Sequence, residues 1–305
     1  MLVIKRFDEI SYKEAITLWN ESWKHYFSDM TMDLNRFLQK VTGEGISLEH
    51  SVVAVYEGKL AGFALNSFRT INGKRFVWNG GTAIAPDFRG MGIGEKLIQA
   101  CLEIYEEQNV DFARLEAIKE NEKAIKLYEK MGYQTFEELS FLLHEGEISV
   151  IQGSSSNVVV KNATIQEVLS LSFFEPLTAW QTQFQSLKDF SCALAVDGGR
   201  PVGYAVYKKS FKETGELAGI VLYQCAIDTK CDLEEETTAN LINFAFAPEA
   251  GAIRRLTMNL PKKQDTLSRL LKKAGFTTFV EQVHMERPIK KGSRNKGSKN
   301  FFRID

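Results

Sequence analysis

A glycine-rich turn is the part of this sequence best suited to holding a phosphate. Residues 77–85 are mostly small or apolar and end at Pro86, which predicts a buried strand, and apolar residues at helical spacing over 95–106 predict a helix. Glycines let the backbone approach a ligand closely, and N–H groups at a helix N-terminus bind anions. We therefore predict a phosphate site between the strand and the helix, formed by Arg89, Gly90, Met91, Gly92, Ile93 and Gly94, with Arg89 adding positive charge.

This turn has two other interpretations. It could be a tight structural turn without a ligand. A dinucleotide-binding fold would place Gly-x-Gly-x-x-Gly after its first strand, with an acidic residue about 20 positions on. Here the pattern is Arg-x-x-Gly-x-Gly and follows roughly the fourth predicted strand, an order that disfavours the dinucleotide fold.

A second motif follows the turn and completes a resemblance. Residues 121–133 predict a short helix that carries a tyrosine and stops at a glycine. In this order and spacing the two segments resemble the GNAT superfamily of acyl-CoA-dependent N-acyltransferases. The first family motif is matched by Arg89, Gly92 and Gly94, and the second by Asn121, Ala124, Leu127, Tyr128, Gly132 and Tyr133. The resemblance covers about residues 1–145.

The resemblance implies a fold and a co-substrate. The expected fold class is α+β with three layers (α/β/α), in which a mixed, mostly antiparallel sheet is flanked by helices. Acetyl-CoA is the implied co-substrate, without a metal, and backbone amides of the turn would hold its pyrophosphate. The strand before the turn would splay from its neighbour. The backbone of Ile84 would then bind the pantetheine arm, and Asn121 would help to hold the cofactor.

The order of predicted elements fits this fold. Strands are expected at 1–7, 52–56, 61–68, 77–85 and 112–117, with helices at 12–28, 33–42, 95–106 and from 121, and a final strand pair over 133–144. The first helices carry an aromatic cluster that the family would use around its acceptor: Trp19, Trp23, Tyr26 and Phe27, with His25 between them. Trp19, Trp23 and Phe27 recur at helical spacing, which favours core positions for most of the cluster.

Acetylation of an amine needs a base for the amine and a proton for the departing thiolate. A lysine amine has a pKa of about 10.4 and is rarely neutral at pH 7. The motif position of Tyr128 makes it the expected acid. Glu116 alternates with Leu115 on its strand and is the expected base. Some N-terminal-amine acetyltransferases of this family pair a glutamate and a tyrosine at this separation.

The assignment of the base has open alternatives. The family often has an acidic residue on the strand before the turn, but here residues 76–82 contain none. A water relay past Asn79 could replace it. Glu116 could equally be a solvated or salt-bridged strand glutamate.

The second half of the chain repeats the first without its chemistry. Residues 51–64, 114–116 and 130–136 are echoed by 191–205, 255–257 and 273–279 at offsets near 140 to 143. At these offsets Arg89, Gly92 and Gly94 correspond to Asp232, Glu235 and Thr237, and Tyr128 corresponds to Leu271. Like charge opposes phosphate binding. We therefore expect a catalytic domain at 1–150, a degenerate GNAT-like domain at 151–290 after a polar linker at 153–157, and a basic flexible tail at 291–305.

Composition limits the remaining classes. The formal net charge of −1 and an ordinary apolar content of 44% predict a globular protein with no nucleic-acid partner and no membrane partner. A cytoplasmic location is the default expectation. Neither the four histidines nor the four cysteines (Cys101, Cys192, Cys225 and Cys231) have a metal-binding spacing. Cys101 and Cys192 lie in apolar patterns and are expected in the core.

The sequence thus predicts an N-acetyltransferase with one active site, in the first half, acting by direct attack in a ternary complex. The alternatives are transfer from another acyl-CoA such as succinyl-CoA, or a non-catalytic acyl-CoA sensor. The acceptor is a primary amine of a small molecule or peptide whose identity stays open, as do the acyl-chain preference and the oligomeric state.

Overall fold

The chain folds into two compact units, which we describe separately. The computed structural model describes residues 1–24, 26–27, 29–152 and 158–290. Unit 1 consists of Met1–Phe136 and the segment from His284, and unit 2 consists of Glu137–Val283. The expected boundary at residue 150 thus lies inside unit 2, and residues 284–290 belong to unit 1. The expected linker at 153–157 and the tail at 291–305 lie outside the described residues, as does His25.

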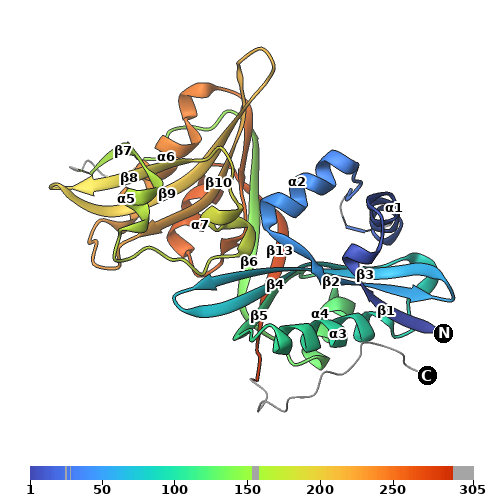
Figure 1. The fold of residues 1–305 in the computed structure, drawn as a ribbon. Helices are drawn as coiled ribbons and strands as arrows, with labels where there is room; N and C mark the ends of the chain where they lie inside the picture. Colours follow the sequence, from blue (N-terminus) through green and yellow to red (C-terminus); the bar gives the residue numbers. More distant parts are fainter. Residues whose placement is uncertain (25, 28, 153–157, 291–305) are drawn as a thin grey trace. The chain divides into compact units, whose positions relative to one another are not determined.

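Unit 1 has three layers. Its sheet is built from β1 (Leu2–Arg6), β2 (Ile46–Tyr56), β3 (Lys59–Ile71), β4 (Lys74–Ile84) and β5 (Phe112–Ile118) in that spatial order. One face is covered by α1 (Tyr12–Ser22) and α2 (Leu34–Glu44), and the other by α3 (Ile93–Glu107) and α4 (Glu122–Lys130) (Figure 1). The expected α/β/α fold is confirmed.

The sheet opens between β4 and β5. Its other pairs, β1–β2, β2–β3 and β3–β4, are antiparallel, whereas β4 and β5 are parallel. Their ladder joins only Phe76 to Phe112, Val77 to Ala113 and Trp78 to Arg114. Beyond these pairs β4 runs on to Ile84 and β5 to Ile118 without pairing to each other. The two strands therefore diverge directly before the glycine turn.

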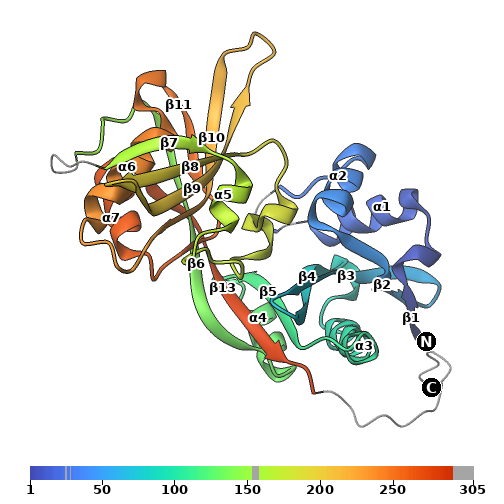
Figure 2. The same cartoon turned by 60° about the vertical axis from the view of Figure 1, so that its left-hand side comes forward.

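The last two strands correct the expected strand pair over 133–144. That stretch is one long strand, β6 (Gln134–Gly146), and its neighbours are β13 (Thr277–Pro288) and β11 (Ile253–Thr257). β13 lies between β5 and β6 (Figure 2). A strand from the end of the chain therefore occupies the place where the sequence predicted a local hairpin, because the edge of a sheet accepts any strand of matching register.

The first helix is also shorter than expected. α1 ends at Ser22 rather than Ser28. The Trp19 indole donates to the Met30 carbonyl at 2.6 Å, and the Asn20 side-chain amide bonds both backbone groups of Met32. These contacts hold residues 30–32 against α1. The backbone groups of Met30 and Met32 thus bond side chains of α1, and the helix does not continue through them.

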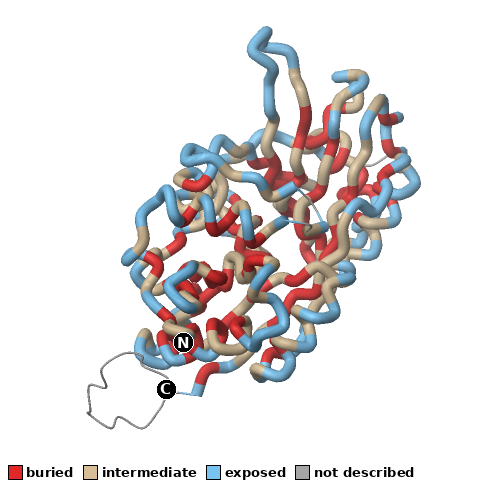
Figure 3. The backbone as a smooth tube through the Cα atoms, turned by 90° about the vertical axis from the view of Figure 1, so that its right-hand side faces the viewer, coloured by how far each residue is buried: buried red, intermediate tan, exposed pale blue. Residues whose placement is uncertain are grey.

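Apolar side chains from both helical layers fill unit 1. On the α1–α2 side, Trp19 stacks on Phe63 at 5.3 Å and Phe7 on Phe37 at 6.2 Å, all of them buried. On the other side α3 buries Leu97, Ile98, Cys101, Ile104 and Tyr105. The expected core position of Cys101 is confirmed. Figure 3 shows this pattern along the backbone, with buried residues in the strands and inner helix faces.

Unit 2 repeats the plan of unit 1. Its sheet has the order β6–β11–β10–β9–β8–β7, with β13 on the other side of β6. Its remaining elements are β7 (Val159–Ala163), α5 (Ile165–Leu169), β8 (Ser191–Asp197), β9 (Arg200–Phe211), β10 (Leu217–Ile227), α6 (Glu234–Phe246), β12 (Leu260–Pro261) and α7 (Asp265–Lys273). Its β10 and β11 pair in parallel, as β4 and β5 do in unit 1.

The repeat extends to single backbone angles. The residue before α4, Asn121, has φ −83° and ψ 61°, and the residue before α7, Gln264, has φ −84° and ψ 65°. Both helices have nine residues and are followed by a glycine with positive φ, at 86° for Gly132 and 92° for Gly275. The sequence repeat is therefore a repeat of structure.

Candidate functional site

The glycine turn has the backbone that an anion site needs. Gly90 and Gly92 have φ of 80° and 74°, and Gly92 caps α3 without a side chain. A Cβ on either glycine would meet no atom within 4 Å, so the space in front of the turn is open. The first N–H groups of a helix have no partner within the helix. Those of Ile93, Gly94 and Glu95 therefore adjoin open space, at the positive end of α3.

Arg89 holds the turn in place. Its Nε donates to the Ile84 carbonyl at 3.1 Å, and one terminal nitrogen donates to the carbonyls of Ser22 and Lys24 at 3.0 and 3.2 Å. The guanidinium therefore joins the end of β4 to the end of α1. Its role in binding phosphate stays a prediction, but its positive charge does lie beside the turn.

The two sequence motifs meet through α4. A Cβ on Gly94 would lie 3.1 Å from Leu127 Cδ2, so the absence of a side chain lets the first turn of α3 approach α4 closely. Lys130 Nζ also pairs with Glu95 at 2.7 Å. The tertiary packing thus brings the glycine turn and the tyrosine helix into contact.

Tyr128 is the only buried side chain of α4 and bonds the diverging strand. Its ring is 7% exposed. Burial raises the pKa of Tyr128 to about 12; a hydrogen bond with Thr82 of β4 lowers this pKa, and the nearby Tyr26 raises it. The Thr82 hydroxyl in turn donates to Asn79 Oδ1 at 3.0 Å. Tyr128 is therefore a neutral phenol at physiological pH, placed against β4 where β4 has left β5.

Asn121 has two partners within unit 1. Its Oδ1 accepts from the Ala124 N–H at 3.2 Å and so caps α4. Its side chain also bonds the hydroxyl of Tyr26, whose pKa is raised by burial and lowered by this bond. These contacts give Asn121 a structural reason to be present, and its contact with a cofactor stays a prediction.

Ile84 presents backbone at the open edge of β4. Ala85 N donates to Ala61 O of β3 at 2.9 Å, so by alternation the backbone groups of Ile84 point away from β3. The Ile84 carbonyl accepts from Arg89, which leaves its N–H for the predicted contact with a pantetheine amide.

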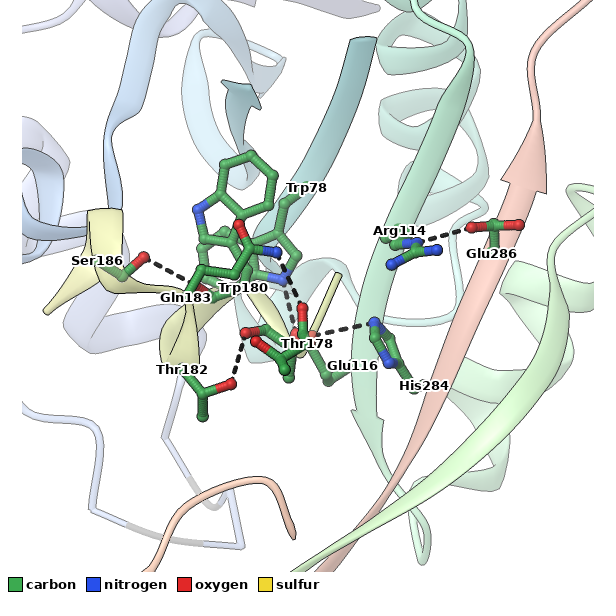
Figure 4. Close-up of polar contacts among 11 residues, drawn as sticks. Trp78, Arg114, Glu116, Thr178, Trp180, Thr182, Gln183, Ser186, His284 and Glu286 are labelled. Atoms are coloured by element: carbon green, nitrogen blue, oxygen red, sulfur yellow. Dashed lines mark hydrogen bonds and ion pairs between the residues drawn. The ribbon is translucent and has the colours of Figure 1, made fainter. Parts of the chain in front are cut away.

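Glu116 is buried and held by an indole. Its side chain is 6% exposed, and Oε2 accepts from Trp78 Nε1 at 2.6 Å (Figure 4). Oε1 lies 3.5 Å from His284 Nε2 of β13. Of the alternatives kept open for Glu116, a solvated glutamate is therefore wrong, and a contact with a cation-forming side chain is present. Its role as the base stays a prediction.

Sequence reasoning missed three side chains around these groups. Trp78 and Thr82 stand on the motif strand, but a bulge at Gly80 interrupts the period of two between them. Trp78 therefore faces Lys40 of α2, whereas Thr82 faces Tyr128 of α4, which a simple alternation of the sequence does not predict. His284 stands 168 residues after Glu116, and no local pattern links them.

Other site types find no support in the described part of the chain. No three His, Cys, Asp or Glu side chains within it gather as a metal site would require. Among the same residues, no helix is long and apolar enough to cross a bilayer.

Comparison with known families identifies the first part of the chain. Residues 11–133 match the acetyltransferase (GNAT) family, a range that contains the glycine turn, Glu116 and Tyr128. This part of the chain is a GNAT acetyltransferase domain. No curated protein matches the chain by sequence.

Solved structures share the fold over nearly the whole chain. A GCN5-related N-acetyltransferase from Sphaerobacter thermophilus has a TM-score of 0.67 at 15% identity, covering 97% of this chain and 98% of its own. A tandem GNAT protein from the clavulanic acid biosynthesis pathway has a TM-score of 0.61 at 11% identity, covering 96% and 99%. A GCN5-related N-acetyltransferase from Anabaena variabilis has a TM-score of 0.59 at 17% identity, covering 95% and 73%. At these identities the likeness concerns the fold alone, and it agrees with two GNAT-like units.

Proposed function

We propose that the protein transfers the acetyl group of acetyl-CoA to a primary amine, with one active site, in unit 1. The observation that carries this proposal is the position of Tyr128, which bonds Thr82 at the divergence of β4 and β5 while its neighbour Leu127 touches Gly94 of the turn. A proton donor and an anion site thus occur on one open strand edge. The residues suited to hold the cofactor are the turn amides, the Ile84 N–H and Asn121.

The reaction needs only groups that this unit contains. The amine nitrogen attacks the thioester carbonyl carbon, a C–N bond forms, and the C–S bond breaks. Tyr128 gives its hydroxyl proton to the departing sulfur, and a base takes the surplus proton of the amine. The pKa of Tyr128, raised by burial to about 12, keeps the proton in place until the thiolate forms.

Unit 2 would not bind acetyl-CoA on this proposal. Where unit 1 has Gly92 at the N-cap of α3, unit 2 has Leu233 at the N-cap of α6, followed by Glu234, Glu235 and Glu236 in the first turn. Where unit 1 has Tyr128, unit 2 has the buried Leu271. The Gln264 side chain donates to the Cys225 carbonyl of β10 at 3.0 Å. A side chain of unit 2 itself therefore bonds the strand that corresponds to β4.

A screen of pooled primary amines tests the proposal. Peptides with free α-amines, lysine derivatives, polyamines and aminoglycosides would each be incubated with protein and acetyl-CoA, and released thiol would be measured. We expect one pool to give thiol release that depends on both amine and protein, and a smaller rate with succinyl-CoA. Calorimetric binding of acetyl-CoA without thiol release from any pool would instead favour an acyl-CoA sensor.

A further inference from the structure

A buried carboxylate and a buried imidazole meet at the inner end of the divergence between β4 and β5. Glu116 is 6% and His284 is 1% exposed, and Oε1 lies 3.5 Å from Nε2. Oε2 is held by the Trp78 indole, while Oε1 has no hydrogen bond within the described residues. Burial of a carboxylate is costly unless its charge is compensated. The His284 imidazole is placed to compensate the buried charge of Glu116, so its position has an electrostatic consequence as well as a packing one.

The strand ladder places His284 there. Arg114 Nε pairs with Glu286 at 2.7 Å, two residues before Glu116 on β5 and two after His284 on β13. The two pairs are successive cross-strand pairs of an antiparallel ladder on one face (Figure 4). The backbone register that pairs Arg114 with Glu286 thus also brings His284 to Glu116.

The pair lies at the fork of the strands and not in the middle of the sheet. Trp78 and Arg114 form the last pair of the β4–β5 ladder, and Glu116 follows two residues beyond it. The Trp78–Glu116 hydrogen bond therefore joins the two strands where their backbone pairing has stopped. On the same strand β4, four residues further on, Thr82 holds Tyr128.

Few charged groups surround the pair. The Phe136 ring lies 4.3 Å from the His284 ring on the β6 side and 5.0 Å from the Arg114 guanidinium. From α2, Lys40 Nζ lies 5.6 Å from the Trp78 ring and is itself paired with Glu44. Arg114 is balanced by Glu286. Of the cation-forming side chains in the described residues, His284 is the one within 4 Å of the Glu116 carboxylate.

We propose that His284 is a positioning residue that holds the Glu116 carboxylate for accepting the proton of the acceptor amine. This inference rests on the proposed acetyl transfer. In the step, an N–H bond of the amine breaks as its nitrogen forms the C–N bond, and the proton moves to Oε1. Trp78 holds the other oxygen, and the imidazole stabilises the charge and the rotamer of the carboxylate. The last strand of the chain therefore completes the active site of the first unit.

Two substitutions of His284 separate positioning from packing. His284→Gln keeps an N–H donor within reach of Oε1, whereas His284→Phe keeps a ring against Phe136 and removes the donor. We expect kcat to fall about 10- to 100-fold in His284→Phe and to recover largely in His284→Gln, with the KM for acetyl-CoA unchanged in both. Glu286→Gln is the matched control, because it alters the next pair of the same ladder and should leave kcat within about twofold.

A double-mutant cycle tests the coupling. In the Glu116→Gln background, which itself lowers kcat, His284→Phe should lower kcat no further. The pH profile of kcat should change in Glu116→Gln and in His284→Phe. In Glu286→Gln it should match the profile of the unaltered protein. Equal losses in His284→Gln and His284→Phe, or additive losses in the double variant, would overturn the proposal.

A spectroscopic readout separates this inference from the proposed function. The protein has four histidines, so the ring ¹⁵N signals of His284 in the full chain can be assigned by substitution. We expect these signals to move in Glu116→Gln and to stay in Glu286→Gln, whether or not any amine is acetylated. Unmoved signals would refute the pair, while moved signals in a protein that acetylates no amine would refute the acetyl transfer and, with it, the catalytic use of the pair.

Discussion

The two units present opposite charges at the same point of a shared plan. In unit 1, α3 begins at glycines, and its N–H groups adjoin open space. In unit 2, α6 begins with Glu234, Glu235 and Glu236, and Glu235 pairs with Arg269 at 2.9 Å. Carboxylates at a helix N-terminus satisfy its positive end from within the chain. The difference teaches that a GNAT-like unit keeps its architecture without the anion site, because helix and strand packing do not depend on it.

The second difference concerns the helix after the diverging strands. α4 and α7 share length and backbone geometry, but α4 buries Tyr128 where α7 buries Leu271. Both side chains pack their helix onto the sheet, and only the phenol has a proton to give. Packing accounts for the apolar bulk of both side chains, and the proposed acid role of Tyr128 would account for its hydroxyl. The predictions below test whether the two units differ in function as they differ here.

The largest effect is expected from removing the final strand. A chain ending at Val283 keeps all of unit 2 but loses the segment of unit 1 that begins at His284, where Arg287 bonds the Met131 carbonyl and Ile289 N donates to Asp111 O. We expect it to be insoluble or to bind no acetyl-CoA, because the edge of β5 and its apolar neighbours would be exposed. A chain ending at Lys290 is the control and should behave normally in purification and calorimetry.

A shorter fragment, residues 1–153, lacks both unit 2 and the final strand and should fail in the same way. If residues 1–153 were soluble and fully active, the second half would be dispensable. Its role would then be regulation or partner binding.

Gly92→Val should abolish most cofactor binding. The new side chain would enter the open space in front of the turn and strain a residue with φ 74°. Losing about two charged hydrogen bonds of about 1.5 kcal/mol or more each weakens binding roughly 100-fold or more. Gly215→Val, at φ 85° in a hairpin of unit 2 and also facing open space, is the matched control and should leave the affinity unchanged.

Calorimetry on the unaltered chain should give one acetyl-CoA per chain. Two sites per chain would break the comparison between the units. An unchanged affinity in a folded Gly92→Val protein would count against the turn as the phosphate site.

Tyr128→Phe should lower turnover and spare binding. The ring keeps its packing, while the proton donor is lost, and a general acid contributes about 10²- to 10⁴-fold. We expect the low end, because a CoA thiolate leaves fairly well. Rapid-mixing measurement of the chemical step is the appropriate readout, with Leu271→Met of α7 as the control. A Phe variant with unaltered chemistry would remove Tyr128 from the mechanism.

The smallest effect concerns stability at alkaline pH. Burial raises the pKa of Tyr128 from 10.0 to about 12, so the folded state keeps this proton while an unfolded chain loses it. The stabilisation is complete below pH 10 and is lost as pH rises toward 12, at about 1.4 kcal/mol per pH unit. Urea unfolding from pH 9 to 11 should show a shallower decline in Tyr128→Phe and an unaltered one in Leu271→Met. Equal slopes in all three proteins would contradict the buried phenol.

Much of the site could be predicted because its parts are local. The glycines of the turn are needed where φ is positive, and Asn121 caps the helix three residues before Ala124, so residue type alone points to both features. Where local signals were weak the predictions failed. α1 ends early because Trp19 and Asn20 bond a later segment, and the expected hairpin over 133–144 is one strand because a distant strand pairs with it.

The sequence by itself determined the GNAT motifs, the repeat and the absence of the motif residues from the second copy, since each depends on residue types at short or regular spacing. The tertiary structure alone decided that β13 lies beside β5 and that His284 meets Glu116. The physical reason is that helix caps and turns are fixed by neighbours in the chain. Strand pairing instead depends on which sheet edge is open and which register buries the right face, and these are properties of the folded molecule.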